Sequence, residues 1–531
     1  MKTLRKYIIA GVLAIFASTL FWWNFADDLF ARPEDDLSLQ LRKFNYLLYK
    51  IREDYVEEPN MTELLDGAIN GMLESLDPHS VYIPAEEQSR LTERFRGDFE
   101  GIGISFVIQN KILTVISPIP GTPSDRLGIR TGDKIIKIDG KSAYGITNEE
   151  VFEKLRGPKG TTVNVTIARE GIDEPLEFAI VRDKIPIHSV ETSFMIDDQT
   201  GYILLNQFTT NTTPELEEAL DDLMSQGMTQ LIFDLRGNSG GYLDQAVNVA
   251  DEFVPGGEKI VFTRGRDTSS ETAYYSTDKT TKSNIDLIIL INHGSASASE
   301  IVAGAVQDLD RGLVVGTRSF GKGLVQTPIP LGDGSLVRLT TSRYYTPSGR
   351  LIQRPYSDES ISDYYREAFT DEDTTAEQPD STREVFFTKG HRKIFGGGGI
   401  EPDIKLESSY FTAFGAKLLN QRLFFEYAAV YSAKHPEIAS DFKDFLKNFQ
   451  VSEAMLTEFL DLVKSKNIEI DQPDYAKDKI FFKNIIKAEI AQNLYNNRTY
   501  YYQVRIQGDD QVIRAGELFG DARKIADLWN K

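Results

Sequence analysis

The spacing of hydrophobic and polar residues changes several times along the chain, and each change marks a predicted structural boundary. Over residues 37–96 apolar residues recur every three or four positions, as on one face of a helix. Residues 97–184 instead contain short apolar runs, and the segment 163–167 alternates apolar and polar residues like a half-buried strand. Residues 185–406 mix strand-like runs with helical stretches, and residues 407–531 return to a helical pattern. We therefore predict a multidomain protein of mixed α/β and α+β class, with a helical N-terminal region, a β-rich domain, an α/β core and a helical C-terminal region.

Three apolar runs of the α/β core, Leu231–Leu235, Leu287–Ile291 and Leu313–Val315, are predicted to be buried strands. Helical stretches lie between them, which is the arrangement of an α/β domain. Residues 358–380 are acidic and rich in Ser and Thr, so we expect an exposed insertion there.

At the N-terminus, three basic residues precede a mostly apolar run, Tyr7–Ala26. About twenty helical residues span about 30 Å, the thickness of the hydrocarbon core of a bilayer. A cleaved signal has a shorter apolar region and a small-residue cleavage site, whereas Trp22 and Trp23 suit a membrane interface. We expect residues 1–31 to be an uncleaved signal anchor, with a cleaved signal peptide as the alternative, and the rest of the chain to be exported.

Composition and charge restrict the chemistry. The chain has 531 residues, with 59 Lys plus Arg against 80 Asp plus Glu and a formal net charge of −21. Phosphate backbones are bound by clustered positive charge, so this balance argues against a nucleic-acid partner. The sequence contains no cysteine, which excludes disulfides, thiolate metal sites and cysteine nucleophiles. The five histidines lack metal-ligand spacing, and we expect no metal and no other cofactor.

A segment of small residues, 294–300, follows the predicted strand Leu287–Ile291 and opens a predicted helix. Its three serines, Ser295, Ser297 and Ser299, would lie where free N–H groups and the helix dipole can stabilise a developing oxyanion. One interpretation is a nucleophilic serine. The other is a helix N-cap, for which Ser299 is well suited.

Residues 316–323 follow the predicted strand Leu313–Val315 and nearly match a phosphate-binding loop. An ATPase is disfavoured because Gly323 occupies the position whose hydroxyl would hold Mg²⁺. Lys322 could instead be a catalytic base, if burial lowers its pKa from about 10.4 towards 7–8. An ordinary exposed lysine in a turn is the alternative.

A third segment, residues 234–242, lies at the end of the predicted strand Leu231–Leu235. Its Asn-Ser-Gly-Gly stretch would expose the backbone N–H groups of Gly240 and Gly241, which suits an oxyanion or carboxylate site. A plain turn explains the same residues equally well.

Together, these segments resemble the carboxy-terminal processing (tail-specific) proteases, a family of Ser–Lys peptidases with a PDZ domain. The separation of 25 positions between Ser297 and Lys322 matches the family spacing. The likeness covers about residues 41–406 and leaves out the acidic insertion and the C-terminal helical region. Further family-like segments are 76–80, 101–104, 333–335, 345–347 and 399–403.

The resemblance implies a serine endopeptidase that cleaves proteins near apolar C-terminal tails. By position in the family motifs, Ser297 is the nucleophile, Lys322 is the general base and Gln326 orients the lysine. The backbone N–H of Ala298, together with that of Gly240 or Gly241, would form the oxyanion hole.

The β-rich domain, expected at residues 97–184, resembles a PDZ domain. The loop that would bind a substrate's terminal carboxylate is Gly101, Ile102, Gly103 and Ile104. A bound tail would add to the sheet as a strand, with its apolar side chains in a pocket. Arg156 aligns with a family position that can link the PDZ domain to the active site, although a surface arginine at a helix end is an equal interpretation.

The resemblance also implies where and with what the protein works. We expect protein substrates with apolar tails and a catalytic part in the periplasm or cell envelope, held at the inner membrane by the N-terminal segment. If that segment is cleaved, the protein would be secreted or periplasmic. An adaptor protein and a homo-oligomer are further partners compatible with the family. The rival function is a PDZ scaffold that binds tails without cutting, and the intact set of Ser297, Lys322 and Gln326 argues against it.

Overall fold

The structure is a computed structural model that describes residues 37–267, 271–279, 282–356, 360–368, 383–407, 411–439 and 441–529. It divides into two compact units, residues 1–75 and residues 76–531. The predicted signal anchor (residues 1–31) and most of the predicted acidic insertion lie outside the described residues. No helix within the described ranges is long and apolar enough to cross a membrane.

The described part of the first unit consists of two helices, α2 (Leu37–Asp54) and α3 (Met61–Glu74). Asn60 caps α3, because its side chain accepts the N–H of Glu63. The predicted helical N-terminal region is thus confirmed as helical. Its last helix, α4 (Ala85–Arg96), belongs to the second unit.

The PDZ-like module, residues 98–186, follows α4. The short strands β2 and β9 pair with each other at the two ends of the module. Side chains of the predicted alternating segment 163–167 point alternately into its apolar core, and Val163, Val165 and Ile167 are buried. The sheet has the order β3-β4-β5-β7-β8, with β6 beside β5. The elements are β2 (Asp98–Gly101), β3 (Ile104–Gln109), β4 (Ile112–Pro118), α5 (Pro123–Arg126), β5 (Lys134–Ile138), β6 (Lys141–Ser142), α6 (Asn148–Leu155), β7 (Thr162–Ala168), β8 (Leu176–Val181) and β9 (Asp183–Pro186).

The α/β core is built on a six-stranded sheet of order β10-β11-β12-β15-β16-β21, in which only β10 runs antiparallel to its neighbour. Three of these strands are the predicted buried strands, confirmed within one residue at each end. The strands are β10 (Val190–Met195), β11 (Thr200–Leu205), β12 (Gln230–Asp234), β15 (Asp286–Ile291), β16 (Leu313–Gly316) and β21 (Ile404–Lys405).

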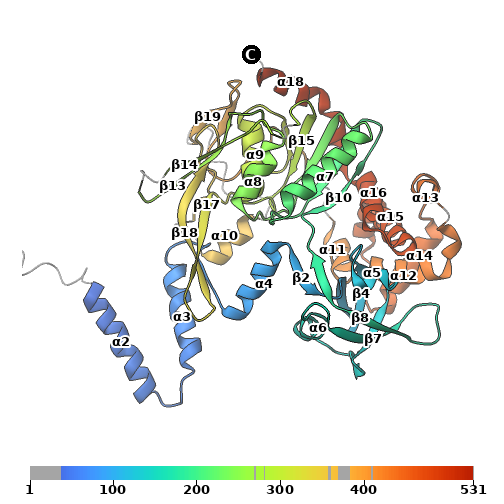
Figure 1. The fold of residues 1–531 in the computed structure, drawn as a ribbon. Helices are drawn as coiled ribbons and strands as arrows, with labels where there is room; N and C mark the ends of the chain where they lie inside the picture. Colours follow the sequence, from blue (N-terminus) through green and yellow to red (C-terminus); the bar gives the residue numbers. More distant parts are fainter. Residues whose placement is uncertain are drawn as a thin grey trace, which may run out of the picture. The chain divides into compact units, whose positions relative to one another are not determined.

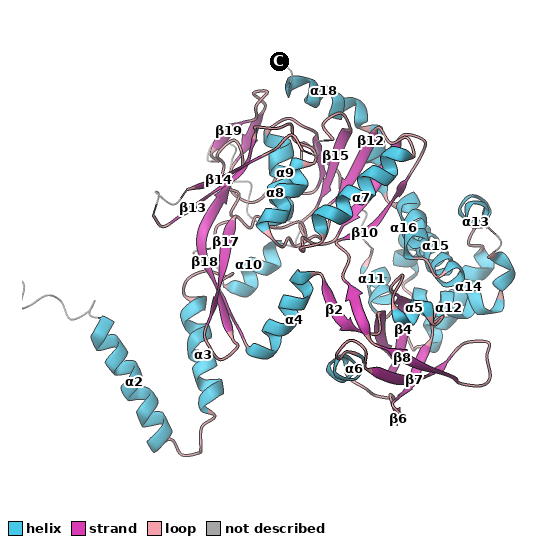
Figure 2. Ribbon diagram, viewed as in Figure 1, coloured by secondary structure: helices cyan, strands magenta, loops and turns pink. Residues whose placement is uncertain are grey.

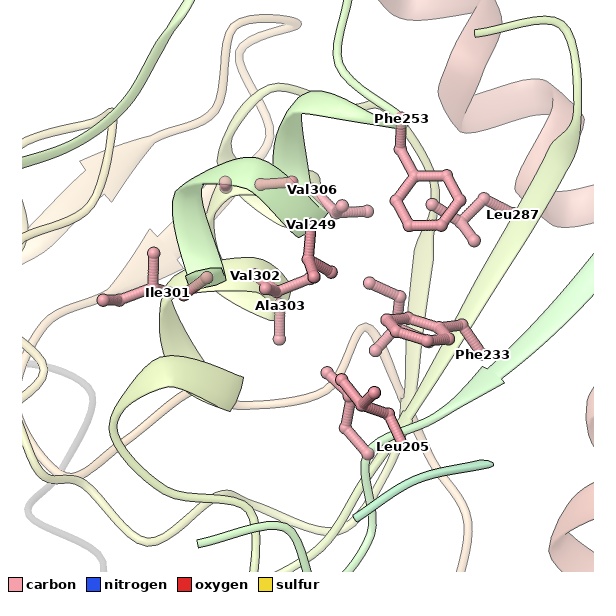
Figure 3. Close-up of a cluster of buried hydrophobic side chains, with 14 of the residues drawn as sticks. Leu205, Phe233, Val249, Phe253, Leu287, Ile301, Val302, Ala303 and Val306 are labelled. Carbon is pink, nitrogen blue, oxygen red and sulfur yellow. The ribbon is translucent and has the colours of Figure 1, made fainter. Parts of the chain in front are cut away.

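Both faces of this sheet are covered, which explains why its strands are apolar throughout. One face carries the helices α7 (Thr212–Ser225), α8 (Leu243–Asp251) and α9 (Ala298–Asp308), as Figures 1 and 2 show. Figure 3 shows part of the apolar core between the sheet and these helices, with Phe233 of β12 beside Phe253. The other face packs against residues of the C-terminal helices, including Val512 and Phe519.

A second, antiparallel sheet lies beside the core and has the order β1-β18-β13-β14, with β17 pairing β18. It joins the start of the second unit to the segment after Lys322, because β1 and β17 both pair with β18. The remaining elements of this part of the chain are β1 (Val81–Ile83), β13 (Lys259–Gly265), β14 (Thr272–Tyr275), β17 (Leu324–Pro330), β18 (Leu336–Tyr345), α10 (Ile361–Ala368), β19 (Val385–Phe387) and β20 (Lys393–Phe395).

The C-terminal helical module, residues 411–529, confirms the predicted helical region. Helices α11–α15 enclose an aromatic core in which Phe424 and Phe459 stack at 4.7 Å and Phe482 packs on both. The module consists of α11 (Ala413–Asn420), α12 (Leu423–Lys434), η3 (Pro436–Ile438), α13 (Phe442–Asn448), α14 (Glu453–Ser465), α15 (Gln472–Tyr495), α16 (Arg498–Arg505), η4 (Ile506–Gly508), α17 (Asp510–Glu517) and α18 (Phe519–Trp529).

Candidate active site

Ser297 lies on the turn between β15 and α9, at the N-cap position of the helix. Its backbone has φ 54°, a left-handed conformation that costs a non-glycine residue about 1–3 kcal/mol. The turn is held because the Ser297 N–H donates to the Glu300 carboxylate at 2.8 Å, and its carbonyl accepts the N–H of Ile301 at 3.0 Å. A strained turn of this kind leaves the Ser297 side chain half-exposed at the start of a helix.

The structure distinguishes the three serines of this segment. Ser295 and Ser299 are fully buried, and their hydroxyls donate to the carbonyls of Leu235 and Asn238, each at 2.8 Å. The Ser297 hydroxyl donates to no acceptor in the described part of the chain. The interpretation of Ser299 as the N-cap is wrong, because α9 begins at Ala298 and Ser299 lies inside its first turn.

Lys322 lies in the loop between β16 and β17, with its amine pointing to Gln326. Its Nζ donates to Gln326 Oε1 at 3.0 Å, and Gln326 Nε2 donates to the carbonyl of His79. Burial, and then the positive charge of Arg338, lowers the pKa of Lys322 to about 8, although Glu300 and Asp77 act in the opposite direction. A large fraction of the amine is therefore neutral near pH 8.

The loop around Lys322 does not form a phosphate-binding loop. The residues after it form β17 instead of the helix on which such a loop depends. The flanking glycines serve a different purpose, since a Cβ on Gly323 would lie 2.9 Å from the backbone N of Gln353. They allow the backbone on either side of Lys322 to pass close to neighbouring loops.

Glu300 connects the backbones of Ser297 and Lys322. One carboxylate oxygen accepts the N–H groups of Ser297 at 2.8 Å and Lys322 at 2.9 Å. The other accepts the Ser319 hydroxyl at 2.5 Å and the N–H of Gly321 at 2.7 Å. Burial raises the pKa of Glu300 to about 7, against these four hydrogen bonds, which favour the charged form. Sequence reasoning did not select this residue, although a charged side chain in a small-residue segment was the available signal.

Tyr344, on β18, forms a second bridge between the same two residues. Its buried hydroxyl lies 3.1 Å from the carbonyl of Ser297 and 2.6 Å from that of Lys322. The backbones of the two predicted catalytic residues are thus joined through both Glu300 and Tyr344. Their side chains are not hydrogen-bonded to each other, since within the described residues Lys322 Nζ donates to Gln326 and not to Ser297.

The three backbone N–H groups predicted for the oxyanion hole differ in whether they already donate a hydrogen bond within the protein. The N–H of Gly240 donates to the Asn238 side chain at 2.9 Å and is not available to a substrate. The N–H groups of Gly241 and Ala298 donate to no acceptor among the residues that the structure describes. A Cβ on Gly240 would lie 2.9 Å from Ser297 Cβ and 3.0 Å from Ala298 N, so glycine keeps this space open. Ala298 and Gly241 are the pair with uncommitted donors.

A buried turn, residues 77–80, holds the far side of Gln326. The Asp77 carboxylate accepts the N–H groups of His79 and Ser80, both at 2.8 Å, and so fixes the turn. Burial, and then the nearby Lys322 charge, lowers the pKa of His79 to about 3, so its ring is neutral. The backbone carbonyl of His79 accepts the hydrogen bond from the Gln326 amide. Sequence analysis placed this turn among the family-like segments but did not connect it with the site.

The predicted tail-binding loop borders an apolar groove in the PDZ-like module. The groove is formed between β3 and α6 and is lined by apolar residues that include Phe106, Val151 and Phe152. The carbonyl of Ile102 accepts the Ser124 hydroxyl at 2.7 Å, so the loop is held with this carbonyl turned inwards. Gly101, Ile102, Gly103 and Ile104 are therefore brought together at the groove, and Ile102, Gly103 and Ile104 line it directly.

Arg156 ends α6 and also lines the groove. Its guanidinium lies over the rings of Phe99 at 4.5 Å and Phe152 at 4.7 Å. It donates to the Glu93 carboxylate of α4 at 2.5 Å. Arg156 is thus in contact with both the groove and the helix that leads from the 77–80 turn, and it is not an isolated surface arginine.

The described side chains around Ser297 are not a set of metal ligands. Within the described ranges, no cluster of three or more His, Cys, Asp or Glu side chains could hold a metal ion. The groups assembled around Ser297 are instead an amine, an amide, a carboxylate and backbone N–H donors, which suit proton transfer and stabilisation of an oxyanion.

Comparison with known proteins adds four family matches. The peptidase family S41 matches residues 199–361, and a PDZ domain matches residues 114–169. The N-terminal domain of the activating protease CtpB matches residues 28–87, and a family of unknown function matches residues 414–496. The matches follow the order of the regions along this chain.

Individual relatives agree with these matches. The carboxy-terminal-processing protease of Bartonella bacilliformis is 43% identical over 356 residues, covering 66% of this chain and 80% of that protein. The carboxy-terminal processing protease CtpA of Bacillus subtilis is 32% identical over 402 residues, covering 74% and 85%. Among solved structures, a photosystem II D1 C-terminal processing protease is 27% identical and covers 68% of this chain and 86% of its own, with a TM-score of 0.35.

Proposed function

Because this chain belongs to the carboxy-terminal processing proteases, serine peptidases of family S41 that carry a PDZ domain, we propose that it cleaves peptide bonds with Ser297 as nucleophile and Lys322 as general base. The observation that carries the proposal is the double bridge between these two residues. Glu300 binds both backbone N–H groups and Tyr344 lies within reach of both carbonyls, so two residues 25 positions apart keep a fixed relation. Such preorganisation is what a nucleophile and its base need.

In the proposed acylation step, neutral Lys322 takes the proton of the Ser297 hydroxyl while Oγ attacks the carbonyl carbon of the scissile bond. The N–H groups of Gly241 and Ala298 stabilise the oxyanion that forms. Protonated Lys322 then passes its proton to the leaving amine, and the C–N bond breaks to give an acyl-enzyme. Water, deprotonated by Lys322, attacks the ester, and Ser297 recovers its proton.

Lys322 must swing from Gln326 towards Ser297 for the first of these steps. Catalytic hydrogen bonds are often absent before substrate binds, and a lysine side chain has the rotatable bonds to make the move. Until the lysine moves, Gln326 holds its amine without adding a charge, and the His79 carbonyl fixes the orientation of the Gln326 amide.

For substrate selection, we propose that the PDZ-like module binds apolar C-terminal tails of protein substrates. The apolar groove and the fixed loop Gly101–Ile104 suit an added strand that ends in a carboxylate. Arg156, between the groove and Glu93, is the proposed regulatory link to the protease core. The substrates would be exported or membrane proteins of the cell envelope, and residues 1–31 would anchor the enzyme at the inner membrane.

The test is turnover of a protein with an apolar tail by the wild type, Ser297→Ala and Lys322→Ala. Each variant should lose at least about 10³-fold in kcat, because removal of a nucleophile or its base leaves only binding and oxyanion stabilisation. Lys417→Ala, at an exposed lysine of α11, is the matched control and should retain activity. A tail-binding scaffold predicts that all four proteins behave alike, and equal turnover would reject the proposed mechanism.

A second measurement identifies the nucleophile directly. A serine-directed fluorophosphonate should label the wild type at Ser297, and fragmentation of the labelled tryptic peptide must locate the label because Ser295 and Ser299 lie on the same peptide. Labelling should be absent in Ser297→Ala and slow in Lys322→Ala, because the probe also needs an activated hydroxyl. Labelling at another serine would reject the assignment.

A further inference from the structure

Besides covering one face of the core sheet, the C-terminal helical module reaches the carboxyl ends of the core strands. A cavity of about 400 Å³ lies at this junction, between the ends of β11 and β12 and the segment from α16 to α17. Charged residues from both sides line it, among them Asp234 and Arg236 of the core and Arg498 and Asp509 of the module. Asp234 and Arg236 lie at the start of the segment 234–241, which also contains the predicted oxyanion-hole glycines Gly240 and Gly241.

Arg236 is the group that joins the two sides. Its Nε and one Nη donate to the Asp234 carboxylate, at 3.0 and 2.6 Å. The same Nη also donates to Asp509 at 2.9 Å, and the other Nη donates to Asp509 at 3.2 Å and to Gln511 at 2.8 Å. The guanidinium is therefore fully hydrogen-bonded, and three of these contacts come from the C-terminal helical module.

Asp509 is itself firmly held. It is the N-cap residue of α17, where its carboxylate accepts the N–H groups of Gln511 at 3.0 Å and Val512 at 3.2 Å. Burial opposes its ionisation, but the Arg236 charge and these hydrogen bonds outweigh burial and lower the pKa of Asp509. Gln511 in turn donates to the carbonyl of Leu406 at 2.6 Å. The module thus presents a charged, rigid anchor to Arg236.

The loop after Arg236 has little freedom of its own. The N–H of Gly237 donates to the Asn292 side chain at 2.9 Å, and the Asn238 side chain donates to the carbonyl of Leu205 at 2.8 Å. The carbonyl of Asn238 accepts the N–H of Ala296, next to the nucleophile, at 3.0 Å. Arg236 is thus the first of several hydrogen-bonded residues that together set the course of the short segment ending at Gly241.

We propose that Asp509 of the C-terminal helical module is a positioning residue of the active site, because it holds Arg236 and thereby sets the oxyanion-hole segment 236–241. The inference rests on the proposed catalytic function, in which Gly241 donates to the oxyanion. It assigns a role to a region that the family resemblance leaves out.

Point substitutions are needed for the test, because the module also supports the PDZ-like module. Gln492 of α15 is fully buried and donates to the carbonyl of Ile116 in β4 at 3.0 Å, and Asn496 accepts the Thr131 hydroxyl at 3.2 Å. Deleting the C-terminal helices would remove these contacts together with Asp509. A loss of activity after deletion would not identify its cause.

Asp509→Asn separates the two roles of this side chain. Asparagine is as good an N-cap as aspartate, so α17 should keep its first turn, while the charge that pairs with Arg236 is lost. We expect kcat on a short peptide without a PDZ-binding tail to fall about three- to thirtyfold, with KM changed less than about twofold. The rate of labelling by a fluorophosphonate should fall by the same factor, since the phosphonyl oxygen occupies the oxyanion hole.

Two matched controls isolate the effect. Asp471→Asn makes the same change at the N-cap of α15, where Asp471 accepts the N–H of Asp474 at 3.0 Å. Arg523→Gln removes another ion pair between the module and the core, with Asp286 at 2.6 Å, at the amino end of β15. Both controls should retain wild-type kcat, and the melting temperatures of all three variants should lie within about 2 °C of one another.

The outcomes are decisive. Wild-type kcat in Asp509→Asn, or an equal loss in both controls, overturns the inference. In an Arg236→Lys background, Asp509→Asn should add less loss than it causes alone, and a full additional loss would show that Asp509 acts by another route. Ser297→Ala is measured in the same assay. If it keeps wild-type activity, the proposed function itself fails. If Ser297→Ala is inactive and Asp509→Asn is fully active, only the role of Asp509 is rejected.

Discussion

Gln326→Glu would replace a neutral partner of the Lys322 amine with an anion of nearly the same shape. In the structure, Gln326 Oε1 lies 3.0 Å from Lys322 Nζ. Burial and the charge of Arg338 together bring the pKa of the lysine to about 8. A carboxylate at this distance favours the protonated lysine. The substitution therefore works directly against the condition on which the proposed base depends.

The size of the effect follows from the pKa. An opposite charge within about 4–6 Å shifts a pKa by about 1–3 units. With a pKa of about 8, about a quarter of Lys322 is neutral at pH 7.5, and a rise of about one to two units leaves about 3% to 0.3% neutral. Activity at pH 7.5 should therefore fall about 8- to 80-fold. It should return towards the wild-type value as the pH is raised, because the amine loses its proton at higher pH.

The assay is kcat/KM for a short fluorogenic peptide from about pH 6 to pH 10.5. The wild type should rise with pH through an inflection near pH 8, and Gln326→Glu through one that is about one to two units higher. Gln326→Met is the control, because it removes both hydrogen bonds without adding a charge; its activity should fall without an upward shift of the inflection. An unchanged inflection in Gln326→Glu, or a wild-type profile that is flat down to about pH 5, would refute neutral Lys322 as the base.

Three further substitutions probe other parts of the site. Glu300→Gln places an amide NH₂ against two of the four donors that the carboxylate accepts, and each donor left unpaired costs about 1–3 kcal/mol. Both thermal stability and peptidase activity should therefore fall. Wild-type values of both would contradict the bridging role of Glu300. Tyr344→Phe removes the hydroxyl that bridges the carbonyls of Ser297 and Lys322 and should lower the free energy of unfolding by about 1–3 kcal/mol in a denaturant titration, together with kcat. A loss of stability at unchanged kcat would separate the hydroxyl from catalysis. Gly103 has φ 83°, and a Cβ added there would lie 2.2 Å from the Thr122 hydroxyl oxygen. Gly103→Ala should therefore weaken binding of an apolar-tailed peptide at least about tenfold in fluorescence anisotropy and leave cleavage of a short tailless peptide unchanged. Unaltered tail binding would exclude this loop as the carboxylate site.

Much of the fold was accessible from the pattern of the sequence. The strands β12, β15 and β16 were predicted from continuous apolar runs because both of their faces are covered, so nearly every side chain is buried. Alternation in β7 was equally clear in the sequence, and in the structure Thr162 and Asn164 are exposed whereas Val163 and Val165 are buried. The division of the helical N-terminal region was not predicted, since α3 and α4 have the same periodicity although they belong to different units.

The site was only partly accessible, because its partners are distant in sequence and leave no periodic signal. Nothing local distinguishes Ser297 from Ser299, since the difference lies in the distant carbonyl of Asn238, which accepts the hydroxyl of Ser299 and not that of Ser297. Gln326 and the His79 carbonyl are 247 positions apart, so neither segment indicates that the two meet. Arg236 and Asp509 are 273 positions apart, and the family resemblance that pointed to Ser297 and Lys322 does not extend to Asp509.

The left-handed conformation of Ser297 connects these observations. A glycine would relieve the strain but would remove the nucleophile, so the cost of about 1–3 kcal/mol must be offset by neighbouring groups. Glu300 and Tyr344 do this by bonding its N–H and carbonyl, and the same two groups bond Lys322. Changes at Glu300 or Tyr344 must therefore reduce stability and activity together. Within the described residues, the Gln326 side chain hydrogen-bonds to the lysine amine and the 77–80 turn, so its variants should alter the pH profile with a smaller loss of stability.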